Sequence, residues 1–353
     1  MKKNDMIKII IAIAVTLIVV FILNMVLDNY QRRVVNLCAI YVILGLSMNL
    51  INGFTGLFSL GHAGFMAIGA YTVAIITMPT SMKELNFFMK PMMPALLKIE
   101  MPVIKLLPQA LNEGLWFVFA LLMAGLIAAI FGFLIGAPVL KLTDDYLAIA
   151  TLGFSEIIRI VIINMQGITN GALGLKGIPQ KTNLMWAWSV ATVTILFMYL
   201  LIKGSYGKAF KAIREDEIAA RSMGINLFKH KVMSFTIGSF LAGVGGGLLA
   251  AALGTIDPAL FKFALTFNIL LIVVLGGMGN ILGTVVSAII ITISMEGLRF
   301  LDEAINFGFF KTDALPGLRM VVFSLVLMIV VIFKKDGFVK NALEKVRGLH
   351  VKN

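Results

Sequence analysis

The feature of this chain that most constrains its fold is a succession of apolar runs, most of them long enough to cross a lipid bilayer. A hydrocarbon core of about 30 Å requires roughly 20 apolar residues per helical span. The 353 residues are 59% hydrophobic and only 14% charged, which is too apolar for a soluble domain with a charged surface. We therefore expect an all-α, polytopic integral membrane protein that forms a single transmembrane domain over residues 1–353, with about ten transmembrane helices.

The runs are separated by charges or by Gly and Pro. The expected spans are 7–27, 34–51, 60–78, 115–137, 146–165, 185–203, 232–253, 266–277, 281–300 and 316–333. The first run lacks a small-residue cleavage site and is expected to remain as a span. The eighth is too short to cross unaided, so either a tight or partly re-entrant turn at Gly276–Asn280 joins it to the ninth or the two runs form one kinked helix.

The distribution of basic residues predicts the orientation of the spans. Lys and Arg accumulate in short cytoplasmic loops, whereas Asp and Glu have little influence. With both termini inside, 17 basic residues fall on the cytoplasmic side and 10 on the other side. This N-in, C-in arrangement makes 79–113 an extracytoplasmic loop, 204–231 a cytoplasmic loop and 334–353 a cytoplasmic tail.

Several kinds of chemistry are not expected. The only cysteine, Cys38, cannot form an intrachain disulfide, and no two of the three histidines are spaced as zinc ligands on one helix, so no metal site is expected. The sequence contains no G-x-x-x-x-G-K-[ST] run, no H-E-x-x-H and no G-x-S-x-G. It therefore has no catalytic site of its own to predict, either for ATP hydrolysis or for a membrane-embedded enzyme. A passive channel or a sensor remains an alternative at this point.

The polar loop at 204–231 carries an amphipathic pattern. From Tyr206 to Met223 apolar and charged residues alternate at helical spacing without an internal Pro or Gly after Gly207. Glu217 stands four residues before Arg221, which favours an ion pair on an exposed helix, and Gly224 suits the left-handed position past its end. Such a helix could lie at the lipid headgroups or dock into a groove on another protein.

Five stretches of the chain resemble one family of membrane proteins. These stretches are Ala212–Ala220 followed by Met223–Ile225, Phe235–Gly243, Val273–Asn280, Ser59–Tyr71, and Asp145–Leu152 with Glu156–Arg159 and Asn170–Pro179. They are similar to the permeases of branched-chain amino acid ABC importers, and the last is similar to the LivM-type subunit. The matches run from about Leu44 to Gly337, so we expect a permease core over 34–333. Residues 79–112 match nothing in this family.

The resemblance implies a function and a set of partners. It implies a subunit that moves branched-chain amino acids across the bacterial cytoplasmic membrane, paired with a LivH-type permease, two cytoplasmic ATPase subunits that use ATP and Mg²⁺, and an extracytoplasmic substrate-binding protein. No cofactor is expected on this chain and no nucleic acid as partner. A related importer of urea, short amides or another small polar solute is the alternative. The residues implied in coupling to the ATPase are Arg214, Glu215, Asp216, Glu217, Ala219, Ala220 and Gly224.

A Gly-rich passage at 52–64 interrupts two apolar runs. Irregular backbone at membrane depth is tolerated where it is buried in protein or lines a cavity, and broken helices often build transporter sites. The passage is therefore either discontinuous or re-entrant, with Asn52, Thr55, Ser59 and His62 as candidates for the translocation pathway, or an ordinary cytoplasmic turn. In either case His62 is more readily explained as a hydrogen-bonded structural residue than as a proton carrier.

Two charged residues lie near the middle of the fifth span. Glu156 and Arg159 stand three residues apart, so they share a helix face and can neutralise each other in part. The structural interpretation is an internal ion pair, and the functional interpretation is a polar lining that meets the two charges of an amino acid. Glu296 and Arg299 repeat the spacing near the outer end of the ninth span, where the arginine can reach water.

Overall fold

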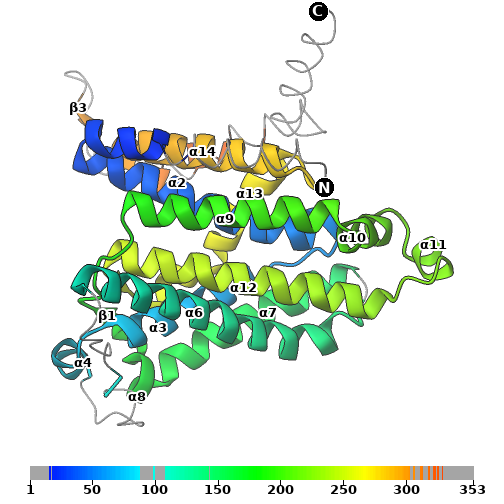
Figure 1. Ribbon diagram of the computed structural model, residues 1–353, viewed down its shortest axis with the longest axis horizontal. Coiled ribbons are helices and arrows are strands. Elements are labelled where there is room, and N and C mark those ends of the chain that lie inside the picture. Colours follow the sequence, from blue (N-terminus) through cyan, green and yellow to red (C-terminus); the bar gives the residue numbers. More distant parts are fainter. Residues whose placement is uncertain are drawn as a thin grey trace, which may run out of the picture.

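The computed structural model describes residues 16, 18–87, 98–99, 108–142 and 144–302, together with short stretches at 305–306, 311–312, 317–318, 321–322, 324–325 and 328. Its long helices lie side by side along one common direction (Figure 1). One end of the bundle, which we call the α10 end, carries helices α10 and α11. The opposite end, which we call the β1 end, carries α4, α8 and strand β1.

The described elements are mostly helices. They are α2 Asn29–Met48, η1 Asn49–Phe54, α3 His62–Thr77, α4 Thr80–Asn86, α6 Gln109–Val139, α7 Asp144–Asn164, α8 Gln166–Thr169, η2 Gly171–Leu173, β1 Leu175–Lys176, α9 Leu184–Lys203, α10 Ser205–Glu215, α11 Glu217–Ser222, α12 Leu227–Leu253, β2 Thr255–Ile256, η3 Pro258–Phe261, α13 Phe263–Gly276, α14 Ile281–Gly297, η4 Leu298–Asp302, β3 Ile305–Asn306 and β4 Lys311–Thr312.

Length and composition make this a multi-pass membrane protein. Among the described residues, 5 helices are long and apolar enough to cross a bilayer, and α3, α13 and α14 are shorter apolar helices. The all-α expectation is confirmed, since the only described strands form two short antiparallel pairs. The expected spans from 34–51 to 281–300 each correspond to a helix within a few residues. Of the expected span 7–27, residues 7–15 and 17 fall outside the described residues and 18–26 is helical, and most of the expected span 316–333 also falls outside them.

The junction of α13 and α14 decides between the two interpretations of the eighth expected span, 266–277, which are a turn before the next span and one kinked helix. The two helices are separate and pack against each other, with a turn at 277–280 between them. Gly277 and Gly279 have φ of 85° and 78°, a conformation that side chains rarely adopt. The glycines allow the chain to reverse, so one kinked helix is the wrong interpretation.

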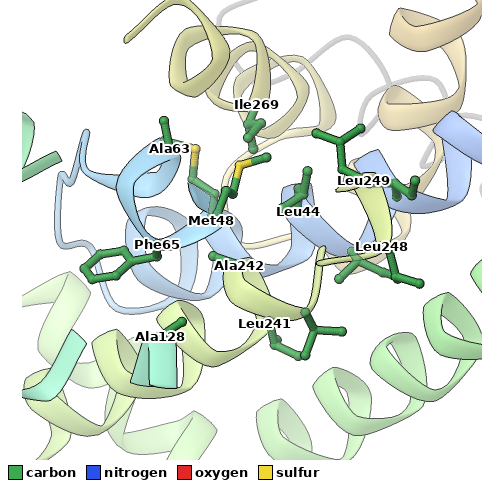
Figure 2. Close-up of a cluster of buried hydrophobic side chains, with 14 of the residues drawn as sticks. Leu44, Met48, Ala63, Phe65, Ala128, Leu241, Ala242, Leu248, Leu249 and Ile269 are labelled. Atoms are coloured by element: carbon green, nitrogen blue, oxygen red, sulfur yellow. The ribbon is translucent and has the colours of Figure 1, made fainter. Parts of the chain in front are cut away.

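Helix α12 forms the centre of the bundle, and small residues allow its neighbours to approach it closely. It packs against α2, α3 and α6. Leu44, Phe65, Ala128 and Leu248 from these four helices meet in the buried cluster of Figure 2. A methyl group added at Gly246 would clash with the backbone carbonyl of Met66. The glycines of α12 thus serve helix packing, as small residues commonly do in membranes.

The β1 end is closed by backbone pairing between distant segments. Strand β1 pairs with β2 in antiparallel register, Leu175 opposite Ile256. Helix α4 joins them through Asn86, whose side chain accepts from Lys176 N at 2.8 Å and donates to Lys176 O at 2.7 Å. Part of the expected loop at 79–113 is therefore ordered against β1. Its extracytoplasmic position stays a prediction.

Candidate functional site

The passage between η1 and α3 returns into the bundle. The Nε2 atom of His62, the first residue of α3, lies 2.9 Å from Ser47 Oγ, which donates to Gly238 O at 2.6 Å. Because the hydroxyl proton is used by Gly238, His62 Nε2 must donate. Ser47 stands seven residues before the end of η1 at Phe54, which is roughly 10 Å of helix. The chain therefore returns to the interior of the bundle before α3 begins. This supports the re-entrant interpretation over an ordinary turn.

The predicted pathway residues of this passage are all buried, and the hydrogen bonds between them join Asn52 and Ser59. Asn52 closes the passage on itself, because its amide donates to Ser59 O at 3.2 Å and accepts from Ser59 N at 3.4 Å. Thr55 donates to Leu50 O at 3.0 Å. The Asn52 side chain satisfies the backbone groups of Ser59, as buried polar groups require, whereas Leu50 O also accepts from Thr55 N at 3.2 Å. His62 is the expected structural histidine, and a role in translocation stays a prediction.

Two further helices form hydrogen bonds with the backbone of the passage. Leu60 N donates to Thr151 Oγ1 at 3.0 Å, and Ala63 N donates to Thr266 Oγ1 at 3.0 Å. The threonines belong to α7 and α13, so two other helices hold the re-entrant segment. Neither threonine stands out in the sequence, because a threonine in an apolar span usually bonds its own helix.

A residue that sequence reasoning missed, Asn49, joins η1 to the α13–α14 turn. Its amide donates to Thr284 Oγ1 at 2.8 Å and to Asn280 O at 3.2 Å, and its Oδ1 accepts from Gly279 N at 2.8 Å. The side chain is fully buried. An asparagine inside an apolar run was the available signal, since a buried amide needs partners.

Arg214 connects α10 to these two irregular segments. Its Nη1 donates to Gly53 O at 3.0 Å, and its side chain packs against Gly56 and Gly279. Glu215 pairs with the same guanidinium from the exposed side. The predicted coupling residue Arg214 therefore faces the bundle, and Glu215 faces outward.

The amphipathic loop is two helices and not the single one expected. Asp216 is extended, with φ of −160°, and its carboxylate accepts from Ile218 N at 2.8 Å and Ala219 N at 3.0 Å. An aspartate that caps a new helix ends the previous one. Helix α10 buries Phe210 and Ile213 against the bundle end. Gly224 follows α11 with φ of 81°, as expected.

Helix α11 exposes apolar side chains at the edge of the molecule. Ile218 is 81% exposed and Met223 83% exposed, whereas Ala220 is 3% exposed and packs underneath. Ala219 is exposed beside Ile218. The expected Glu217–Arg221 ion pair is wrong, because Glu217 pairs with Lys231 of α12. The two large exposed residues are the part of this surface that sequence reasoning did not identify.

Glu156 and Arg159 form the expected ion pair. Arg159 Nε lies 2.7 Å from Glu156 Oε2, and the side chains are 23% and 33% exposed, respectively. The pair is thus neither fully buried nor free in solvent. The ion pair is consistent with the structural interpretation and leaves the lining interpretation open.

Comparison with known proteins gives the family. A family model described as "Branched-chain amino acid transport system / permease component" matches residues 30–332. The chain is 36% identical over 298 residues to the high-affinity branched-chain amino acid transport system permease protein LivM of Salmonella typhimurium, covering 75% of this chain and 62% of that protein. For LivM of Escherichia coli the identity is 36% over 304 residues, or 76% and 64% of the two chains.

The similarity extends more weakly to a second type of permease. The LivH permease protein of the Escherichia coli system is 28% identical over 160 residues, which is 45% of this chain and 48% of LivH. No solved structure matches the chain significantly. The chain spans less than two thirds of the length of the two LivM proteins above. The match over residues 30–332 shows that the chain belongs to the family of branched-chain amino acid transport system permease components.

Proposed function

We propose that this chain is the LivM-type permease subunit of an ATP-driven importer that carries leucine, isoleucine and valine, or similar amino acids, across the bacterial cytoplasmic membrane. Membership of the permease family and the names of its LivM relatives support the proposal. The chain itself contains no phosphate-binding loop of the Walker type. ATP and Mg²⁺ would be bound by separate ATPase subunits.

The partners are part of the same proposal. A LivH-type permease would complete the membrane part, two ATPase subunits would lie on the cytoplasmic side, and a binding protein would deliver the amino acid from outside. The basic residues of the loop between α9 and α12 favour a cytoplasmic position for the α10 end. The β1 end would then face the binding protein.

The observation that carries the coupling role is the exposed apolar pair on α11. Ile218 and Met223 are more than four fifths exposed, and they are the most exposed large apolar side chains of this loop. Burial of such side chains in a groove contributes about 1.5–3 kcal/mol each. Helix-in-groove docking to an ATPase would therefore gain most of its affinity from these two residues, with Glu215 and Asp216 setting orientation.

The contacts of α10 supply a route from that groove into the bundle. Phe210 anchors α10 against His230 of α12, with ring centroids 6.2 Å apart. Arg214 reaches η1 and the α13–α14 turn. Movement of the ATPase would thus shift α10, and α10 would shift the re-entrant segments, as packed elements do in shear motions.

The docking role is tested by retention of the ATPase subunits. The variant I218D/M223D places two charges in the proposed interface and should reduce co-purification of the ATPase subunits with the permease pair at least tenfold. The matched variant I218M/M223L keeps apolar bulk and should retain the ATPase subunits. Equal retention by both variants would show that α11 lies at the lipid headgroups or elsewhere.

A further inference from the structure

A cavity of about 460 Å³ lies between α2, α13 and α14. Its lining combines two opposite charges with apolar walls: Lys262 and Glu296 contribute the charges, Asn268 an amide, and Ile272 and Ile291 apolar surface. Lys262 immediately precedes α13, and Glu296 is the second-last residue of α14. Both charges therefore stand at the β1 end of the cavity, and the isoleucines lie deeper along the same helices.

The cavity reaches the β1 end of the bundle at Lys262. Helix α13 has 14 residues, which is roughly 20 Å, and it ends at the turn that contacts Arg214 at the α10 end. Lys262 immediately precedes this helix and is exposed, so its ammonium can meet water at the rim of the cavity. The rim can therefore hold water or a polar ligand.

The polar groups of the cavity differ in whether they already have hydrogen-bond partners within the protein. Glu296 Oε1 accepts from Tyr30 Oη at 3.3 Å and from Arg299 Nη1 at 3.1 Å, and the Glu296 side chain is 21% exposed. These two donors hold the carboxylate in position. Within the part of the chain that the structure describes, the Lys262 ammonium and the Asn268 amide form no hydrogen bond or ion pair. They remain available to a ligand.

We propose that this cavity binds the transported amino acid as a zwitterion, a proposal that rests on the function proposed above. Lys262 binds the carboxylate, Glu296 binds the ammonium, Asn268 donates to the carboxylate, and the branched side chain points toward Ile272 and Ile291. Opposite charges on one rim suit a molecule that carries both signs. The apolar walls stabilise an aliphatic side chain, whereas urea offers neither charges nor apolar surface.

The first test measures uptake of L-leucine by the complete importer in proteoliposomes. K262Q and E296Q each remove one charge-assisted hydrogen bond, and such bonds are stronger than neutral ones. We expect each variant to lower uptake from subsaturating leucine at least tenfold. K262R and E296D are the matched controls, because each keeps the charge at its position in the cavity lining and should retain most of the uptake. Wild-type uptake by K262Q and E296Q overturns the proposal.

The second test does not depend on transport. N268C introduces a thiol on the cavity wall, whereas the native Cys38 is buried and should give little background. We expect a membrane-impermeant methanethiosulfonate to label N268C, and L-leucine to slow the labelling at least fivefold while urea does not. Labelling that is unaffected by leucine overturns the cavity site. Failure of the unaltered complex to take up leucine instead contradicts the proposed function, and protection of N268C remains a separate result.

Discussion

The guanidinium of Arg214 donates a hydrogen bond to the carbonyl oxygen of Gly53 at 3.0 Å, although the two residues lie 161 positions apart in the sequence. Gly53 belongs to η1, which leads into the re-entrant passage, and the same side chain packs against Gly279 in the α13–α14 turn. The bond therefore joins the exposed loop of the molecule to two irregular segments of its core. If α10 moves as proposed above, Arg214 is positioned to transmit that movement to both segments.

Replacement of Arg214 tests this connection. In R214A the Gly53 carbonyl loses its charged donor, and hydrogen bonds to charged groups contribute about 1.5–3 kcal/mol. We expect ATP-driven leucine uptake to fall about tenfold while the ATPase subunits remain bound and hydrolyse ATP. The control is K208A, because Lys208 is exposed on the same helix α10 and lies outside α11. Equal uptake by R214A and K208A would rule out the connection.

The packing of α12 predicts a contrast between two glycines. A methyl group at Gly246 meets the Met66 carbonyl, whereas one at Gly153 of α7 meets nothing within 4 Å. Overpacking of a close contact costs about 1–3 kcal/mol, and alanine in an open helix position is favourable. G246A should lower the melting temperature of the detergent-solubilised permease by several degrees, and G153A should leave it unchanged or raise it. A similar melting temperature for both variants would contradict the proposed packing.

Asn49 offers a test of the hydrogen bonds that hold the α13–α14 turn. In N49A the Gly279 amide and the Thr284 hydroxyl each lose a partner inside the protein. A buried polar group left without a partner costs about 1–3 kcal/mol. Hydrogen exchange at Gly279 should accelerate at least tenfold. The control N164A removes an exposed side chain that bonds only to Ile160 O. Hydrogen exchange at Gly279 should not change in this variant. Equal exchange rates at Gly279 in both variants would show that Asn49 is dispensable.

The Glu156–Arg159 pair is addressed by a double-mutant cycle. If the 2.7 Å contact is a structural ion pair, E156Q and R159Q each leave one charge without its partner and should lower the level of protein in the membrane. The double variant E156Q/R159Q should recover much of that level and also transport leucine. A double variant that is stable but takes up no leucine would instead favour a lining of the translocation pathway.

The sequence predicted the helices well, because each is encoded locally. Apolar runs of bilayer length, bounded by charge or glycine, correspond to α2, α6, α7, α9 and α12 within a few residues. The Gly-rich passage after Asn52 was also identifiable, since glycine and polar residues rarely interrupt a span without a reason. Prediction failed at Asp216, where an acidic residue at helical spacing caps a new helix and ends the old one.

The candidate site was less predictable, because contacts between distant residues define it. Arg214 was identified, yet its partner Gly53 cannot be inferred from spacing. Ala220 and Gly224 were expected on the docking surface, but Ala220 is buried beneath α11, and Ile218 and Met223 form the exposed part. Apolar residues in an amphipathic helix are normally assigned to the buried face. Only the packing of α11 shows which of them remain outside.

The central claim, that this chain is part of an ATP-driven importer of branched-chain amino acids, is tested most directly by transport. Proteoliposomes that contain this chain with its LivH-type partner and ATPase subunits should take up L-leucine under one condition only. The binding protein must be present on the extracytoplasmic face of the permease and ATP on its cytoplasmic face. Isoleucine and valine should compete, and urea should not. Uptake without ATP, or uptake inhibited by urea in place of valine, would contradict the account.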